Sequence, residues 1–114
     1  MSRMTDAARA YQAGATHRTL RTQEAEVFQV TNAGLRAARA GGPVAQVRAL
    51  ADNRRLWTTV NDLMRDPANA LPMELRASIV SVGLAVQREM ERDAPNFDFL
   101  IAINENLAAG LAAG

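Results

Sequence analysis

The chain has 114 residues, of which 48% are hydrophobic, and its formal net charge is +1. This length fits a single domain covering residues 1–114, since typical domains hold about 100–150 residues. It has no cysteine, which excludes a disulfide framework, a zinc–thiolate site and a cysteine nucleophile. Charges interrupt every apolar run before the ~18 residues that a membrane span needs, and the N-terminus lacks the apolar region of a secretory signal. We therefore expect a soluble cytoplasmic protein.

The charge is unevenly distributed along the chain. Residues 1–48 carry seven arginines against three acidic residues, a net charge of +4, whereas residues 49–114 carry six arginines against nine acidic residues, a net charge of −3. Every basic residue is arginine and none is lysine. Because arginine is well suited to phosphate binding, RNA is a partner to consider. However, the arginines are spread around the helix faces without an aromatic platform for bases. This favours the alternative that arginine replaces lysine because a GC-rich genome favours arginine codons.

Apolar residues at helical spacing predict two helices in the first third of the chain. A short helix over residues 3–13 has a thin apolar stripe of Met4, Ala7, Ala8 and Tyr11. A longer helix over residues 22–40 has its core stripe at Phe28, Thr31, Leu35 and Ala38, widened by Val27 and Val30. The sequence Gly41-Gly42-Pro43 ends it, with Gly41 suited to a left-handed C-cap and Pro43 to the start of the next helix.

The third predicted helix, over residues 43–65, has two adjacent faces. One is a heptad-like seam with two polar members, made of Val47, Leu50, Arg54, Trp57, Asn61 and Met64. The other is wholly apolar and consists of Leu56, Val60 and Leu63. Only one face is needed for a core, so the seam is a candidate for partner binding.

Two further helices follow the loop 66–72. The first begins at Pro72, and its stripe is the strongest core pattern in the chain: Leu75, Ile79, Val82, Val86 and Met90. Gly83 lies within it and suggests a close approach of a neighbouring helix, because glycine in a helix interior costs about 1 kcal/mol relative to alanine. Asn96 is a candidate N-cap of the last helix. With no alternating strand pattern, we predict an all-α antiparallel helical bundle of four main helices plus a short N-terminal helix.

No group of residues suggests catalysis or a cofactor. His17 is the only histidine, and a single imidazole without neighbouring ligands does not make a metal site. The carboxylate pairs Asp62–Asp66 and Glu89–Asp93 have arginines among them, as expected of a solvated face. There is no glycine-rich phosphate loop. We therefore predict a protein that is not an enzyme and has no cofactor or metal.

Binding is the remaining class of function, and the pair Arg54–Trp57 is the main candidate. Tryptophan and arginine are enriched at interface hot spots, and here they are three residues apart, on neighbouring positions of a helix. The alternative is that Trp57 fills the core while Arg54 extends into solvent. The spacing alone leaves both open.

Four segments, "NRRLW" (53–57), "LPMELR" (71–76), "IVSVGLAV" (79–86) and "LIAINENLAAGL" (100–111), resemble in order and spacing the flagellar biosynthesis regulator FlaF family. The early segment "AYQAGATHRTLRTQEAEVF" is also similar. Two departures are Leu20-Arg21-Thr22 where the family usually has Ser-Pro, and Ala85 where it tends to have a bulky aromatic residue. Tyr11 and the following threonine-rich turn also resemble, more weakly, the flagellin chaperone FliS.

The resemblance implies a non-enzymatic protein needed for flagellin production or export, working beside the regulator FlbT. Our leading hypothesis is that it binds the terminal helical segments of flagellin as a cytoplasmic export chaperone. The alternative is a post-transcriptional regulator of flagellin mRNA, acting directly or through FlbT, so FlbT and RNA are the further candidate partners. The predicted partner-binding residues are Asn53, Arg54, Trp57, Asn61 and Met64 of the third helix, and Tyr11.

Overall fold

The structure is a computed structural model that describes residues 25–113, with side chains described for residues 25–110. The short helix expected over residues 3–13, and Tyr11 within it, lie outside the described residues. Within them, the chain forms four helical segments and no strand: residues 25–38 (hereafter helix 25–38), α2 (Pro43–Arg65), α3 (Met73–Met90) and α4 (Phe97–Ala113).

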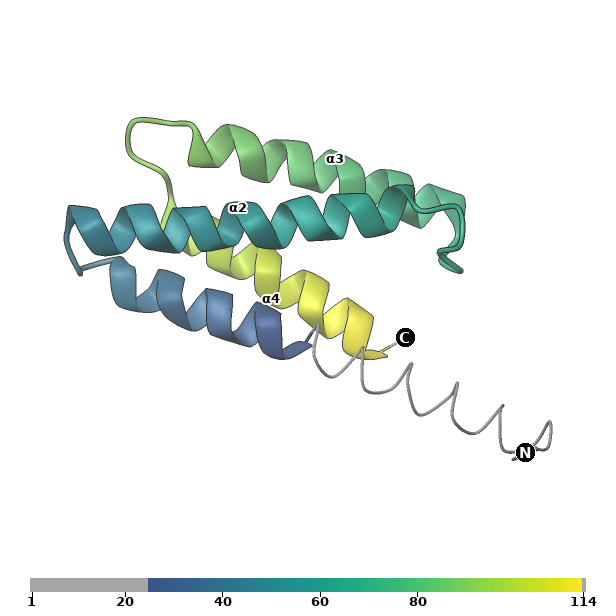
Figure 1. The fold of residues 1–114 in the computed structure, drawn as a ribbon, viewed down its shortest axis with the longest axis horizontal. Helices are drawn as coiled ribbons and strands as arrows, with labels where there is room; N and C mark the ends of the chain where they lie inside the picture. The colour runs from purple at the N-terminus through teal and green to yellow at the C-terminus, as the bar shows by residue number, and fades with distance from the viewer. Residues whose placement is uncertain (1–24, 114) are drawn as a thin grey trace, which may run out of the picture.

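The segments run up and down as an antiparallel bundle (Figure 1). Helix α2 lies between α3 on one side and helix 25–38 with α4 on the other, and each connection reverses the direction of the chain. The prediction of an all-α fold is therefore confirmed, and the predicted bounds of the third helix coincide with those of α2. None of the described helices is both long and apolar enough to cross a bilayer.

The turn between helix 25–38 and α2 depends on glycine, but not on the glycine that the sequence suggested. The positive φ angle, 87°, belongs to Gly42, whereas Gly41 closes the preceding helix by donating its N–H to the Ala38 carbonyl at 3.0 Å. The left-handed cap predicted at Gly41 is thus wrong by one residue. Gly42 occupies the N-cap position of α2, directly before Pro43, so the chain reverses after the first helix has already ended.

Asn96 caps the start of α4 as predicted. Its side-chain Oδ1 accepts a hydrogen bond from the Phe99 N–H at 3.1 Å, which satisfies one of the free donors of the first turn. The Asn96 N–H in turn donates to Oε2 of Glu89 at 3.0 Å. This hydrogen bond, together with Arg92, holds the pKa of the Glu89 carboxyl below its ordinary value, although partial burial opposes the effect. Through Asn96, these hydrogen bonds connect the last turn of α3 to the first turn of α4.

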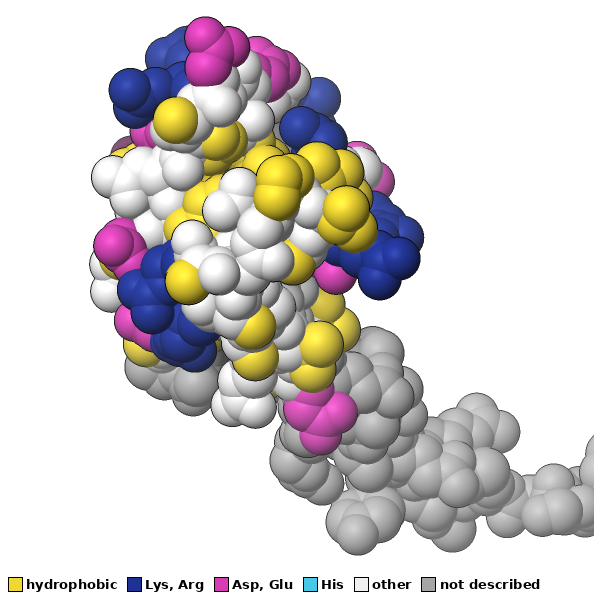
Figure 2. All heavy atoms as spheres, turned by 90° about the vertical axis from the view of Figure 1, so that its left-hand side faces the viewer, with side chains coloured by type: hydrophobic (Ala, Val, Ile, Leu, Met, Phe, Trp, Pro, Cys, Tyr) yellow, Lys and Arg dark blue, Asp and Glu magenta, His cyan; other side chains and the backbone are white. Residues whose placement is uncertain are grey.

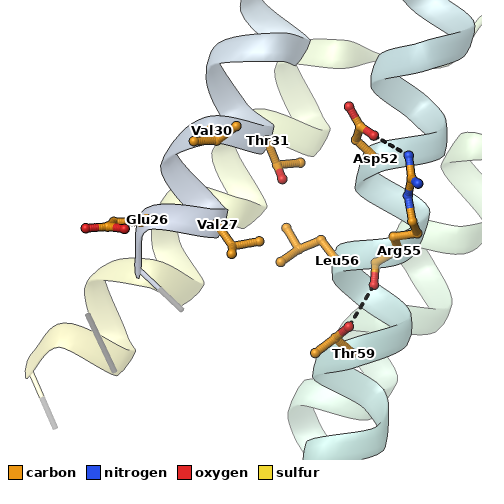
Figure 3. Close-up of a pocket in the computed structure, with 8 residues that line it drawn as sticks. All are labelled: Glu26, Val27, Val30, Thr31, Asp52, Arg55, Leu56 and Thr59. Atoms are coloured by element: carbon orange, nitrogen blue, oxygen red, sulfur yellow. Dashed lines mark hydrogen bonds and ion pairs between the residues drawn. The ribbon is translucent and has the colours of Figure 1, made fainter. Parts of the chain in front are cut away.

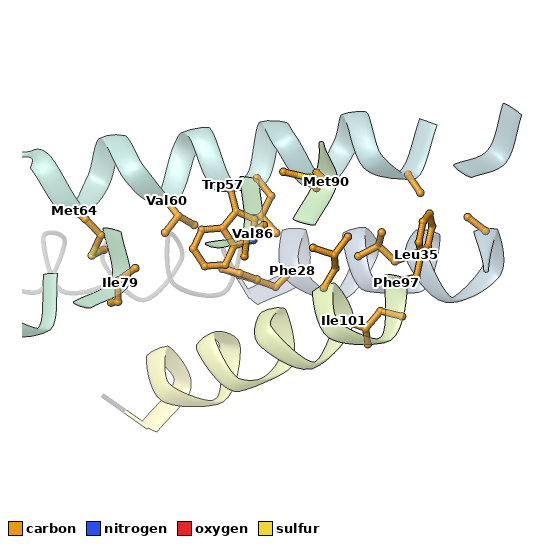
Figure 4. Close-up of a cluster of buried hydrophobic side chains, with 14 residues drawn as sticks. Phe28, Leu35, Trp57, Val60, Met64, Ile79, Val86, Met90, Phe97 and Ile101 are labelled. Carbon is orange, nitrogen blue, oxygen red and sulfur yellow. The ribbon is translucent and has the colours of Figure 1, made fainter. Parts of the chain in front are cut away.

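The core extends along the bundle between all four segments (Figure 4). On α3 the buried positions are Ile79, Val86 and Met90, as predicted, but Leu75 and Val82 remain 45% and 39% exposed. Figure 1 shows the reason: α4 runs away from α3 towards the end at which α3 begins, so that part of the α3 stripe is left partly uncovered.

Helix α4 is attached to helix 25–38 by two ion pairs. Arg36 pairs with Glu105 and Arg39 pairs with Asp98, in the register of two antiparallel helices. These two arginines belong to the basic half of the sequence, so part of its positive charge is neutralised by acidic residues of the chain itself.

Candidate partner-binding groove

Trp57 belongs to the interior of the bundle. Its side chain is only 5% exposed, and its indole Nε1 donates a hydrogen bond to Oδ1 of Asn104 on α4 at 2.8 Å. On the other side it meets α3 at Gly83, where an added Cβ would lie 3.2 Å from Cε3 of the indole. The close approach expected at Gly83 is therefore found, and its neighbour is Trp57. Of the two interpretations of this tryptophan, the structure agrees with the one in which its side chain fills the core.

A network of buried amide side chains surrounds the indole. Nδ2 of Asn104 donates to Oδ1 of Asn53 at 2.7 Å and to Oδ1 of Asn32 at 2.9 Å, and all three asparagines are at most 4% exposed. Asn53 donates to Sδ of Met90 at 3.3 Å, and Asn32 donates to the Ile101 carbonyl at 3.3 Å. The network thus joins helix 25–38, α2, α3 and α4. Because polar groups buried in this way are costly unless paired, it specifies one arrangement of the four segments.

The predicted partner-binding residues are split by the fold. Asn53 and Met64 are buried with Trp57, so these three are contacted by the chain itself and do not offer a surface. Arg54 is exposed and Asn61 is half-buried. The physical reason is that α2 is covered on several sides, and its two predicted faces merge into one wide buried face. Of the predicted set, a partner could reach only Arg54 and Asn61 among the described residues.

A hollow of about 700 Å³ lies elsewhere, between helix 25–38 and α2 (Figure 3). We call it the α2 groove. From helix 25–38 it is lined by Glu26, Val27, Val30 and Thr31, and from α2 by Asp52, Arg55, Leu56 and Thr59. Val27 and Leu56 point towards one another across it. The sequence predicted that Val27 and Val30 would widen the core stripe, but they are 50% and 72% exposed.

The polar groups of the α2 groove lie around these apolar side chains. Arg55 pairs with Asp52 one turn earlier on the same helix, and the Thr59 hydroxyl donates to the Arg55 carbonyl at 3.1 Å. Glu26 adds a second carboxylate on the opposite wall. The groove therefore offers aliphatic contacts with a slight excess of negative charge. A groove between two antiparallel helices, with apolar side chains at its base, commonly binds the apolar face of an amphipathic helix.

Other apolar side chains also reach the surface. Viewed from the end with the loops 39–42 and 91–96, they lie among arginine and acidic side chains (Figure 2). Val44 and Val47, near the start of α2, are 69% and 66% exposed. Among the described residues, no group of three or more histidine, cysteine or acidic side chains is placed to hold a metal ion.

The fold and the groove define a small helical-bundle domain with an apolar hollow on one side and a polar network at its centre. The family model described as "Flagellar protein FlaF" matches residues 7–111, and the chain belongs to this family. The resemblance seen in the four sequence segments is thereby confirmed. No curated protein and no solved structure matches the chain.

Proposed function

We propose that this FlaF-family protein acts by binding and not by catalysis, and that it binds flagellin as a chaperone before export. The family membership supports a role in flagellar biosynthesis. The terminal segments of unpolymerised flagellin become amphipathic helices only on packing with others, so before assembly they are exposed to aggregation. A bundle with an apolar groove that its described residues leave open is suited to hold such a segment.

The observation that carries the proposal is the position of Val27 and Val30 beside the α2 groove. They are half or more exposed on a helix whose other face is packed in the core, and both line the hollow. Val27 points towards Leu56 of α2 across it (Figure 3). An amphipathic helix laid on this surface would remove these aliphatic side chains from water. Each buried methylene contributes about 0.8 kcal/mol, so a few side chains suffice for specific binding.

The test compares two exposed valines in a binding assay with full-length flagellin. Val30→Asp places a charge on the groove, whereas Val47→Asp changes a valine of similar exposure that does not line it. We expect Val30→Asp to weaken binding at least about tenfold in isothermal titration calorimetry, and Val47→Asp to leave it unchanged. Equal effects of the two variants would reject the groove as the site. No association of the unmodified chain with any flagellin of the same cell would reject the chaperone role.

The second candidate function is control of flagellin mRNA, directly or through FlbT. Its support is the net charge of +4 in residues 1–48. The pairing of Arg36 and Arg39 with acidic residues of α4 weakens this support. The two candidates differ in their response to salt. A protein with 6–10 phosphate contacts loses about 10³–10⁵ in affinity between 50 and 200 mM salt, whereas apolar groove binding changes little.

A further inference from the structure

We propose that the protein associates with a second copy of itself, as a symmetric dimer, through the side of α3 that points away from the bundle. We call this side the outer face of α3, and it is defined by five exposed residues: Glu74, Ala77, Ser81, Leu84 and Arg88. The α2 groove lies on the other side of α2 from α3 (Figure 1), so the proposal does not rest on flagellin binding.

The first argument is that α3 is covered on one side only. It lies at the edge of the bundle and packs chiefly against α2 (Figure 1). Its buried residues, Ile79, Val86 and Met90, share one face of the helix. The outer face is opposite, and its residues follow one another at i, i+3, i+7, i+10 and i+14, which keeps them in one line along the helix. Within this line Leu84 is 49% exposed, and an interface would remove it from water.

The second argument is that the charges of the outer face complement themselves. Glu74 lies seven residues before Ser81 and Arg88 lies seven residues after it. In a symmetric dimer the same surface of two copies meets across a twofold axis. With the two α3 helices antiparallel and the axis at Ser81, Glu74 of each copy meets Arg88 of the other. Among the described residues, neither side chain has an ion-pair partner within its own chain.

The residues between the charged ends fit the same arrangement. Ser81 has a short side chain, so the helices can approach each other at the axis. Leu84 lies three residues after the axis and Ala77 four residues before it, so Leu84 of each copy packs against the smaller Ala77 of the other. One pair of helices makes a small interface, and interfaces below about 1,200 Å² are typical of weak complexes. We therefore expect a monomer–dimer equilibrium and not a permanent dimer.

The two charges also suit the ends of a single helix. Glu74 is in the first turn of α3 and Arg88 is in the last, where the helix dipole favours an acidic and a basic side chain respectively. Charge reversal separates the two roles. Exchanging both charges restores the pairing between copies, although it places both side chains unfavourably on their own helix. The dipole alone predicts that this double variant is the least stable one and that association does not change.

Sedimentation velocity of the full-length chain, at concentrations between about 1 µM and 1 mM, measures the equilibrium. We expect the chain to dimerise. Glu74→Arg and Arg88→Glu should each weaken the dimer at least about tenfold, because like charges then meet at both ends of the interface. The double variant should recover most of the affinity. An equimolar mixture of the two single variants should form a heterodimer, since opposite charges meet again in it.

Two leucines of α3 provide a matched control. Leu84 belongs to the outer face, whereas Leu75, at 45% exposure, lies on the same helix outside that face. We expect Leu84→Glu to prevent dimerisation and Leu75→Glu to leave it unchanged, with circular dichroism to verify that both variants fold.

Three results would overturn the proposal: a monomer at every concentration, a double charge variant that does not recover affinity, or equal effects of the two leucine variants. Flagellin binding is measured separately, so its absence would leave this proposal standing.

Discussion

The indole N–H of Trp57 and the side-chain oxygen of Asn104 are joined by a 2.8 Å hydrogen bond inside the core, although 47 residues separate them in the chain. The same asparagine donates to Asn53 and to Asn32, so a single amide on α4 serves three polar groups from α2 and helix 25–38. The position of the tryptophan is therefore determined by hydrogen bonding as well as by packing.

Replacing Trp57 by alanine should destabilise the fold strongly. The change removes a 5%-exposed indole and leaves the Asn104 oxygen without its donor, and we expect the free energy of unfolding to fall by about 3–5 kcal/mol. Urea titration followed by circular dichroism measures the effect. Trp57→Phe, which keeps most of the apolar ring but lacks the N–H, should lose less. A melting curve of the alanine variant close to that of the unmodified chain would show that the indole is not part of the core.

Asn104→Ala should be nearly as damaging, although the side chain is small. It leaves the Trp57 N–H, and the oxygens of Asn32 and Asn53, buried without a partner, and each such group costs about 1–3 kcal/mol. Asn106→Ala on the exposed side of α4 is the control and should stay within about 0.5 kcal/mol. A double-mutant cycle of Asn53→Ala with Asn104→Ala should give a coupling energy of about 0.5–3 kcal/mol. Strict additivity would argue against the network.

Two glycines in helices should respond to alanine in opposite directions. At Gly34 an added Cβ meets nothing within 4 Å, so Gly34→Ala should stabilise the protein by about 0.5–1 kcal/mol through helix propensity. At Gly83 the Cβ would lie 3.2 Å from the Trp57 ring, which its hydrogen bond to Asn104 prevents from moving freely. Overpacking should outweigh the propensity gain, with a net loss of about 1 kcal/mol. Thermal unfolding of both variants provides the comparison.

The contribution of Glu89 should depend on pH. Its pKa is lowered in the folded state, chiefly by the Asn96 N–H, so the stabilisation is fully present above the ordinary pKa near 4.5 and is lost as the pH falls through the lower folded value. Glu89→Gln should therefore be less stable than the unmodified chain at pH 6–8, and the difference should shrink below pH 4.5. Glu91→Gln, at an exposed carboxylate two residues away, is the control. A difference that does not change between pH 3 and pH 7 would contradict this account.

Much of the architecture could be predicted from local signals. Pro43 and the loop 66–72 determine the ends of α2, and Asn96 marks the start of α4; each acts through residues next to it in the chain. Gly83 indicated a close helix contact, but not that Trp57 would be the residue in contact with it. The exposure of Val27 and Val30 could not be predicted in this way. Periodicity gives the width of an apolar face but not the number of neighbours that cover it.

The asparagine network was missed for a related reason. Asn104 follows Phe97, Leu100 and Ile101 at core spacing on α4, and Asn32 occupies an equivalent position between Phe28 and Leu35. Polar residues at core positions on several helices were the available signal. A single sequence, however, does not say which of them meet, since the contacts span 51 and 72 residues.

The central role of Asn104 has a consequence for the order in which the protein matures. In a chain synthesised only as far as the end of α3, Asn32 and Asn53 still lack the amide of Asn104 that joins them, and the Trp57 indole still lacks its hydrogen-bond acceptor. We expect helix 25–38, α2 and α3 to associate only loosely at this stage, because polar groups at their centre still need water as a hydrogen-bond partner. We therefore expect the addition of α4 to convert a loose helical assembly into a defined bundle, and its loss to destabilise the fold by more than its share of buried apolar surface.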